Sequence, residues 1–485
     1  GQRALRSWME QRTEQGESFK LTVLWPQPDE RARKFQSDLS EATRLLPNEL
    51  VAFYGQISGM VSEKPGEARR GSQEPTPPNQ SASTWAQLEA AVEKSAAPLR
   101  RVRELLRDIP SAMADDIEHR METDDLPSFT GARISAQTLH TVVMCELHRG
   151  NHEEALENLD ALLSLVRLYA DEPVLVNYML PIAILGLSAD ACWDALQAPG
   201  WSDAQMARMQ HSVDAPRLLE QLPRVVQAER AARLASWESF RSHSYHHWME
   251  RHEDLVKGFG VKHPDSTSPV LLRQWREWGI HPLWRFAWAD QEELHYLRHS
   301  QSELAAVANS VKVGSWQLLK SGLNTIEQSY RPPPGQWRFH RKLPFYDDVF
   351  VLVGARQPRD PGCPYPAYRR AWEVTFEILT SHQLLVTAVA LRRYALRHAV
   401  FPETLDALVP DLMPEVPRDF MDGQSLRYRR KGDGSFLLYS VGADGRDDGG
   451  DPLPNPGSPP TPPSPWPGRD WVWLQLPPLA PRPGK

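Results

Sequence analysis

The chain has 485 residues, of which 41% are hydrophobic and 24% are charged, and its formal net charge is −7. This length suggests about two to four domains with enough apolar material for sizeable cores. The weakly acidic balance, with no basic stripe, argues against a protein that binds nucleic acid.

The first 61 residues form an N-terminal segment of mixed helical and extended character. Residues 2–16 predict a short charged helix, residues 20–25 alternate as a strand would, and a helical pattern returns over residues 30–62. Residues 62–83 are then rich in proline, glycine and serine, which predicts a mobile linker or loop.

Residues 84–335 predict a helical domain. Its helix starts are indicated by capping boxes, in which a polar N-cap is followed three residues later by Glu or Gln. The three pairs are Thr84 with Gln87, Asn151 with Glu154, and Ser202 with Gln205. Residues 133–169 predict a helical hairpin that is partly similar to a tetratricopeptide unit. No second copy follows at a fixed period, so we expect an irregular helical bundle rather than a solenoid.

A smaller α+β domain is predicted over residues 336–451. A strand at 349–353 precedes a long helix at about 368–398 and a short helix between prolines at 401–410. Strands at 426–429 and 436–439 are joined by a Gly-Asp-Gly turn, as in a hairpin. The tail, residues 452–485, is rich in proline, with one short strand at 470–474. The predicted fold class is therefore mainly α, with a small α+β domain at the C-terminus.

A loop after the last hairpin strand concentrates carboxylates and glycines. Asp444, Asp447, Asp448 and Asp451 lie among four glycines. Carboxylates and carbonyls aimed inward by a glycine-rich turn are the ligands that calcium prefers. The same residues are also common turn formers, so a solvated acidic turn is the alternative. Their spacing does not match an EF-hand.

A histidine cluster is the second candidate site. His243, His246, His247 and His252 lie near Glu250, and His243 and His247 are four residues apart, as zinc ligands on one helix face can be. The spacing misses the inverted zinc-protease pattern by one residue, so the alternative is an ordinary polar helix face. Sequence signatures of a catalytic nucleophile or of a phosphate-binding loop are not found. The alternative function is therefore a metal-dependent hydrolase that uses this histidine cluster.

The segment from the long helix to Asp470 resembles the C-terminal portion of type II secretion major pseudopilins, over about 100 residues. The matching segments are Phe401-Pro402-Glu403-Thr404, Leu408-Val409-Pro410, Pro414-Glu415-Val416-Pro417-Arg418-Asp419 and Tyr439-Ser440-Val441-Gly442-Ala443-Asp444-Gly445. The resemblance implies a pilin-like domain stabilised by a structural calcium. It carries over Asp444 as the first ligand, with Ser440 in the same motif. Asp470 matches the second family aspartate, and Asp447 and Asp448 are alternatives.

The chain also departs from that family. Pseudopilins begin with a membrane-inserted helix that polymerises, whereas the comparable helix here lies deep in the chain and carries Glu373, Glu377, Arg392 and Arg393. The preceding residues resemble uncharacterised, membrane-anchored helical proteins of bacteria with two membranes, on segments such as 147–151 and 171–173. Together these resemblances imply a non-enzymatic structural or interaction protein of the cell envelope, linked to a secretion system.

The expected location is periplasmic or extracytoplasmic, with protein partners at the envelope. No apolar run approaches the roughly 18 residues of a membrane span, and the chain opens at Gly1 without a signal peptide. We therefore expect membrane contact only through a segment preceding Gly1. Cys145, Cys192 and Cys363 match no zinc spacing, and we expect buried free thiols, with a single disulfide pair as the alternative.

Overall fold

The computed structural model describes residues 1–25, 29–54, 68–69, 72–75, 84–110, 129–198, 200–213, 217–244, 274, 276–287, 289–330, 366–453 and 469–473. The strand expected at 349–353, Cys363 and His247 lie outside these residues, as do most of the expected linker and most of the proline-rich tail.

The described residues are mainly α-helical, as expected. In chain order the helices are α1 (Gln2–Glu14), α2 (Leu21–Leu24), α3 (Glu30–Arg44), α4 (Asn48–Tyr54), α6 (Trp85–Lys94), α7 (Ala96–Leu106), α9 (Phe129–His148), α10 (His152–Leu168), α11 (Leu175–Gln197), α12 (Asp203–Val213), α13 (Leu218–Ser242), the π-helical turn η1 (Arg276–Ile280), α17 (His281–Ala287), α18 (Ala289–Val313), α19 (Trp316–Tyr330), α21 (Pro366–His398) and the 3₁₀ turn η3 (Leu405–Leu408). The strands are β1 (Ala68–Arg69), β2 (Ser72–Pro75), β3 (Arg427–Arg430), β4 (Phe436–Ser440) and β5 (Trp471–Val472).

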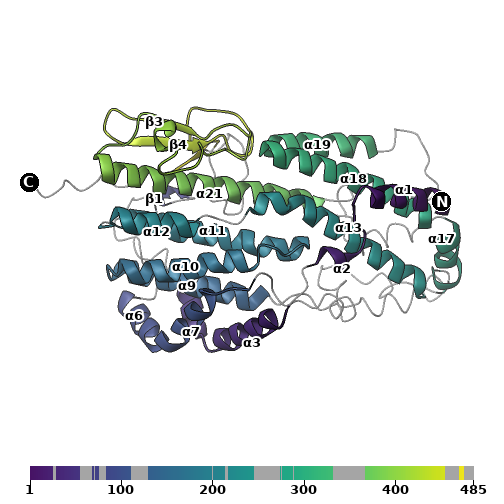
Figure 1. Ribbon diagram of the computed structural model, residues 1–485, viewed down its shortest axis with the longest axis horizontal. Helices are drawn as coiled ribbons and strands as arrows, with labels where there is room; N and C mark the ends of the chain where they lie inside the picture. Colours follow the sequence, from purple (N-terminus) through teal and green to yellow (C-terminus); the bar gives the residue numbers. More distant parts are fainter. Residues whose placement is uncertain are drawn as a thin grey trace, which may run out of the picture.

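Several of the long helices run along the long axis of the molecule and are stacked in layers across it (Figure 1). Figure 1 shows α9, α10, α11 and α21 running side by side, with α3, α6 and α7 beyond α9 and the small sheet on the far side of α21. The N-terminus lies at one end of the molecule, next to α17 and α18, and the sheet lies toward the other end. One continuous apolar core extends from Phe35 of α3 to Trp473 after β5. The sheet and α21 therefore share the core of the helical body.

The predicted helical hairpin is present. α9 and α10 pack against each other, and Gly150 between them adopts a φ of +75°, which favours glycine at a helix end. The capping boxes of Thr84 and Ser202 are both formed, with each backbone N–H and side chain bonded reciprocally. The capping box predicted at Asn151 is wrong, because the Asn151 side chain accepts no capping hydrogen bond. Its Nδ2 instead donates to the Glu146 carboxylate across 2.8 Å.

The strand predicted at residues 20–25 is wrong, because this segment forms the short helix α2. Alternation would have placed Leu21, Val23 and Trp25 on one face, yet Val23 is 67% exposed. Leu21 and Trp25 are one helical turn apart, and both are buried in a cluster with Ala228 and Ala231 of α13. Packing against α13 thus selects the helical spacing over the extended one.

Two helices correct the expectation that no segment is apolar enough to span a membrane. α11 and residues 368–398 of α21 are long and apolar enough to do so, but 61% and 72% of their most apolar windows are buried inside the protein. Burial on most sides accounts for the apolar composition of these windows. Cys145 of α9 and Cys192 of α11 are buried free thiols, as expected.

The C-terminal sheet forms around the predicted hairpin. Its order is β3-β4-β5, and all pairs are antiparallel, with Arg427 opposite Tyr439 and Tyr439 opposite Val472. Every residue of β4 is buried, and β4 packs against α21. The helix expected at 401–410 is reduced to η3, which spans four residues.

The sheet is joined to the helical body by α19 as well as by α21. The backbone N–H groups of Trp316 and Gln317, at the start of α19, donate to the carbonyls of Phe420 and Met421 across 2.9 and 3.0 Å. The first N–H groups of a helix have no partner within it, so the segment that crosses before β3 supplies acceptors for them.

Candidate functional site

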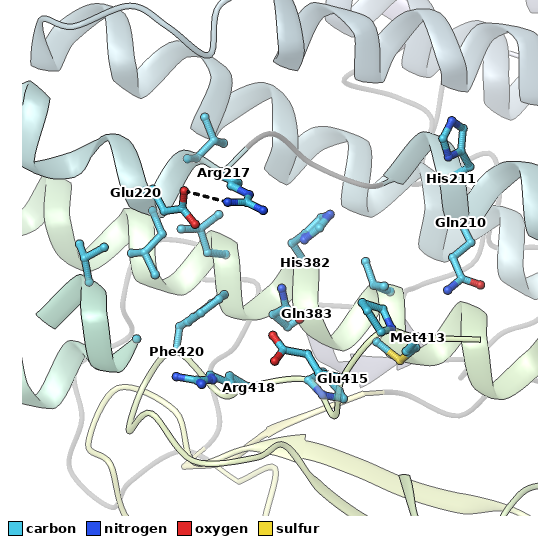
Figure 2. Close-up of a pocket in the computed structure, with 18 of the residues that line it drawn as sticks. Gln210, His211, Arg217, Glu220, His382, Gln383, Met413, Glu415, Arg418 and Phe420 are labelled. Atoms are coloured by element: carbon cyan, nitrogen blue, oxygen red, sulfur yellow. Dashed lines mark ion pairs between the residues drawn. The ribbon is translucent and has the colours of Figure 1, made fainter. Parts of the chain in front are cut away.

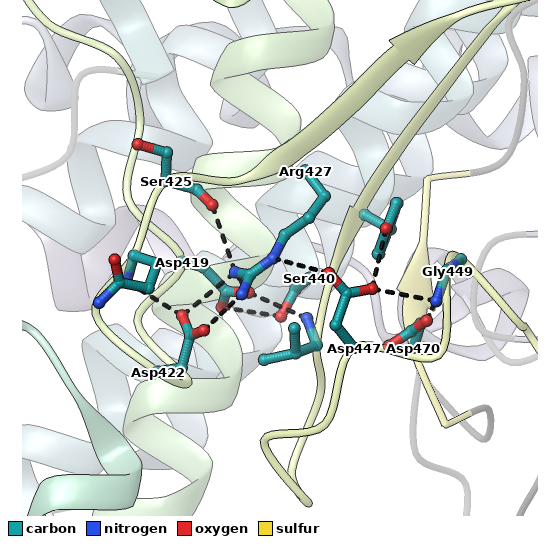
Figure 3. Close-up of polar contacts among 12 residues, drawn as sticks. Asp419, Asp422, Ser425, Arg427, Ser440, Asp447, Gly449 and Asp470 are labelled. Atoms are coloured by element: carbon teal, nitrogen blue, oxygen red, sulfur yellow. Dashed lines mark hydrogen bonds and ion pairs between the residues drawn. The ribbon is translucent and has the colours of Figure 1, made fainter.

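Asp419 is the centre of a buried polar network beside the C-terminal sheet. Its carboxylate is fully buried, and it accepts hydrogen bonds from the Met421 amide at 3.0 Å, the Ser440 hydroxyl at 2.8 Å and the Val441 amide at 2.9 Å (Figure 3). Burial raises the pKa of Asp419 to about 6, although these hydrogen bonds work against the rise. The network joins the segment before β3 to the residues that leave β4.

Arg427, at the start of β3, extends this network toward the acidic loop. Its Nη1 lies 3.1 Å from a carboxylate oxygen of Asp419, its Nη2 lies 2.5 Å from Asp422, and its Nε lies 3.6 Å from Asp447. Figure 3 shows the guanidinium between the three carboxylates. One arginine therefore faces three acidic groups, two from the segment before β3 and one from the acidic loop.

The acidic loop is held close to the rest of the protein by its glycines. Gly442 has a φ of +68°, and a Cβ there would lie 2.4 Å from the carbonyl oxygen of Arg469. Gly445 has a φ of +73° and lies against the side chain of Gln317, whose amide donates to the carbonyl of Ala443 across 2.9 Å. Both positions combine a left-handed backbone with a close approach, so they favour glycine.

Asp470 closes the loop from the other side. Its side chain is 1% exposed, and Oδ2 accepts from the backbone N–H groups of Asp448, Gly450 and Asp451 at 3.1, 2.7 and 3.2 Å. Burial raises the pKa of Asp470 and the charge of Asp447 adds to the rise, while these three N–H groups oppose it. In this arrangement Asp470 fixes the loop as an acceptor of backbone hydrogen bonds.

The remaining predicted metal ligands lie around the same loop, in two environments. Ser440 is buried and donates to Asp419, whereas Asp444, Asp447 and Asp448 are exposed. Asp444 accepts from the Arg446 amide at 3.0 Å. Asp447 accepts from the Tyr439 hydroxyl at 2.9 Å and from the Gly449 amide at 3.0 Å.

The surroundings of Asp447 favour its ionised form. Burial works to raise its pKa, but the hydrogen bonds from Gly449 and Tyr439 and the charge of Arg427 outweigh it and lower that pKa. Within the described ranges, no group of three or more His, Cys, Asp or Glu side chains stands in position to hold a metal ion.

The histidine candidate is described only in part. His243 caps the end of α13, and its Nδ1 lies 2.8 Å from the carbonyl oxygen of Ser239. His246, His247, Glu250 and His252 lie outside the described residues. The predicted pairing of His243 with His247 therefore stays a prediction.

A cavity of about 690 Å³ lies between α12, α13, α21 and the segment before β3. Figure 2 shows His382 and Gln383 of α21 facing Arg217 on one side and Glu415 and Arg418 on the other. His382 is tied to the carbonyl oxygen of Val213 at 2.6 Å, and Arg217 lies 3.6 Å from Glu220. Cations and carboxylates are mixed around the cavity, so its walls select no single ligand charge.

Sequence reasoning did not single out Asp419 or Arg427 as a pair. The available signal was the segment Pro414–Asp419, whose resemblance to the pseudopilin crossover placed Asp419 just before the sheet. Comparison of the chain with protein-family models, with curated proteins and with solved structures gave no match.

Proposed function

We propose that this chain is a non-enzymatic structural or interaction protein of the bacterial cell envelope. In this proposal its C-terminal region is a pseudopilin-like module, stabilised by calcium, within a protein linked to a secretion system. The protein is periplasmic or extracytoplasmic, anchored to a membrane, and acts through protein partners.

The observation that carries the proposal is the arrangement of α21, the sheet and the acidic loop. A long helix packs against β4, a two-proline segment crosses before β3, and the glycine-rich loop follows β4 directly. This order of helix, crossover, small sheet and loop is the order that the pseudopilin resemblance implies. The module is also fastened to the body through α19 and a shared core, which suits a structural role.

Calcium is proposed at the exposed side of the loop. In this proposal the predicted ligands have different parts, since Ser440 and Asp470 are engaged in hydrogen bonds within the protein. Asp444, Asp447 and Asp448 are the exposed carboxylates among them, and carboxylate oxygens are the ligands that a hard cation prefers. Asp470 would then support the site by fixing the backbone from Asp448 to Asp451.

In-cell crosslinking tests the interaction role. A photo-crosslinking residue is placed at Arg429, exposed on β3, and in a matched variant at Glu104, exposed on α7. The proposal expects the tagged full-length product in the envelope fraction and a discrete crosslinked partner from position 429 but not from position 104. A product found only in the cytoplasm, with no crosslink from either position, would contradict it.

A further inference from the structure

The cavity between α12, α13, α21 and the segment before β3 has walls that the protein itself holds in place. Its volume of about 690 Å³ lies in the range in which proteins bind small ligands. Arg393 of α21 donates to Gln210 of α12 at 2.8 Å and to Asp203 at 3.0 Å. His382 is held by the carbonyl of Val213. Because these side chains are already fixed, a ligand would not have to order them on binding.

Gln383 brings an unused amide to this cavity. The residue is half-buried on α21, and Figure 2 shows its side chain among the labelled lining residues, between His382 and Glu415. Within the described part of the chain, its side-chain amide makes no hydrogen bond. A glutamine amide both donates and accepts, so it matches the N–H and C=O groups of a peptide bond.

Apolar side chains line the cavity from three segments. Leu219 of α13, Val386 of α21 and Phe420 of the segment before β3 are half-buried and reach its surface. Leu379 and Met413 lie beside them and are 5% exposed each. The exposed parts of these side chains would be removed from water by an apolar group that entered the cavity.

The charges around the cavity are of both signs. Arg217 lies 3.6 Å from Glu220, and both are exposed. Glu415 and Arg418 are exposed on the opposite wall, and no ion pair engages either of them among the described residues. The Arg418 guanidinium donates only to the carbonyl of Val313, at 3.3 Å. A ligand with a single charge would therefore meet a like charge wherever it met an opposite one.

We infer that this cavity binds an extended peptide segment of a protein partner, with an apolar side chain of that segment packed on Leu219, Val386 and Phe420. A peptide supplies the amide groups that Gln383 can pair with, and it can carry side chains of either sign toward Arg418 and Glu415. A wholly apolar ligand, such as an acyl chain, would instead cover the Gln383 amide without pairing it. The inference rests on the proposed role as an interaction protein, and it adds the site and the chemistry of the partner's segment.

Selection from a library of random linear peptides displayed on phage tests the inference. Sequences enriched on the wild type are synthesised with both termini blocked, and their binding is measured by fluorescence anisotropy. They should contain an apolar residue and bind the wild type. Ala207→Trp fills the cavity from α12 and should abolish binding. Gln383→Leu keeps the side-chain volume but removes the amide, and it should weaken binding about tenfold.

Ala204→Trp is the matched control, because it places the same ring on the exposed side of α12, away from the cavity. It should bind the peptides as the wild type does. Two results would overturn the inference. One is a selection in which the wild type enriches no sequence over Ala207→Trp, and the other is equal binding of the enriched peptides to the wild type and both cavity variants.

The inference and the proposed function can fail separately. Crosslinking at Arg429 reports on a partner at β3, and calcium-dependent melting reports on the acidic loop, and neither segment lines the cavity. A crosslink at Arg429 without peptide binding would leave the proposed function standing and remove the peptide site. Peptide binding that Ala207→Trp abolishes, in a protein found only in the cytoplasm, would support the site and remove the envelope role.

Discussion

The hydroxyl of Ser440 donates a hydrogen bond to the buried carboxylate of Asp419 across 2.8 Å. This bond joins the end of β4 to the segment that crosses before β3. The Gly442 amide donates in turn to the Ser440 hydroxyl at 3.1 Å, so the contact continues into the acidic loop. The partners that reach Asp419 are all donors, and an ionised carboxylate satisfies them together.

Asp419→Ala should destabilise the protein more than any exposed substitution in the same region. It leaves the Ser440 hydroxyl and the Met421 and Val441 amides without their buried acceptor, at a cost of about 2–4 kcal/mol. Urea unfolding followed by circular dichroism measures the loss. Asp433→Ala, in the exposed turn between β3 and β4, is the control and should unfold at the wild-type midpoint. Equal midpoints for both variants would show that the Asp419 network contributes nothing.

Glu303 should make stability depend on pH between about 4.5 and 7. Burial in the helical core raises its pKa from 4.5 to about 7, and the charge of Glu229 adds to the rise, while the Trp372 indole N–H, 3.2 Å away, opposes it. The folded state therefore binds this proton more tightly than the unfolded state. Its contribution is complete below about pH 4.5 and is lost as the pH rises through about 7.

The variant Glu303→Gln isolates this effect, because glutamine keeps an acceptor for Trp372 but cannot ionise. It should be more stable than wild type at pH 8, by about 1–3 kcal/mol, and the difference should vanish near pH 4.5. Glu104→Gln, exposed on α7, should show no such dependence. A constant difference between Glu303→Gln and wild type across this range would rule the effect out.

Gly442→Ala should loosen the acidic loop. Its φ of +68° strains any other residue, and the new methyl group would stand 2.4 Å from the carbonyl oxygen of Arg469. Hydrogen exchange at residues 442–451 should become faster. Gly432→Ala is the matched control, because a methyl group there meets nothing within 4 Å and its φ lies outside the left-handed region. Unchanged exchange in Gly442→Ala would show that the loop tolerates displacement from Arg469.

Local patterns in the sequence predicted the elements that are stabilised by contacts between residues close together in the chain. The hairpin of α9 and α10, the long helix α21 and the hairpin of β3 and β4 all follow from periodicity and turn residues. The boxes at Thr84 and Ser202 formed because both partners lie within one helical turn. Asn151 has the same local pattern, but its backbone N–H donates to the carbonyl of Glu146 and its Nδ2 donates to the Glu146 carboxylate.

Features that depend on distant segments could not be predicted in this way. The helical form of α2 depends on Ala228 and Ala231, about 200 residues away in the chain. The resemblance placed Asp419 and Ser440 in separate motifs, and only the fold brings them to 2.8 Å. It also offered Asp470 as a calcium ligand, but it did not predict that backbone N–H groups of the acidic loop would donate to that carboxylate.

Thermal unfolding in excess calcium and in excess chelator tests the central claim, a calcium-stabilised C-terminal module, most directly. An ion that binds only the folded state stabilises it by about 2.7 kcal/mol at a hundred times its dissociation constant. Chelation should therefore lower the melting temperature of the wild type. Asp444→Ala should lower it similarly and abolish the response to chelator, whereas Asp433→Ala should do neither. Identical melting of the wild type in calcium and in chelator would contradict the claim and leave the loop an ordinary acidic turn.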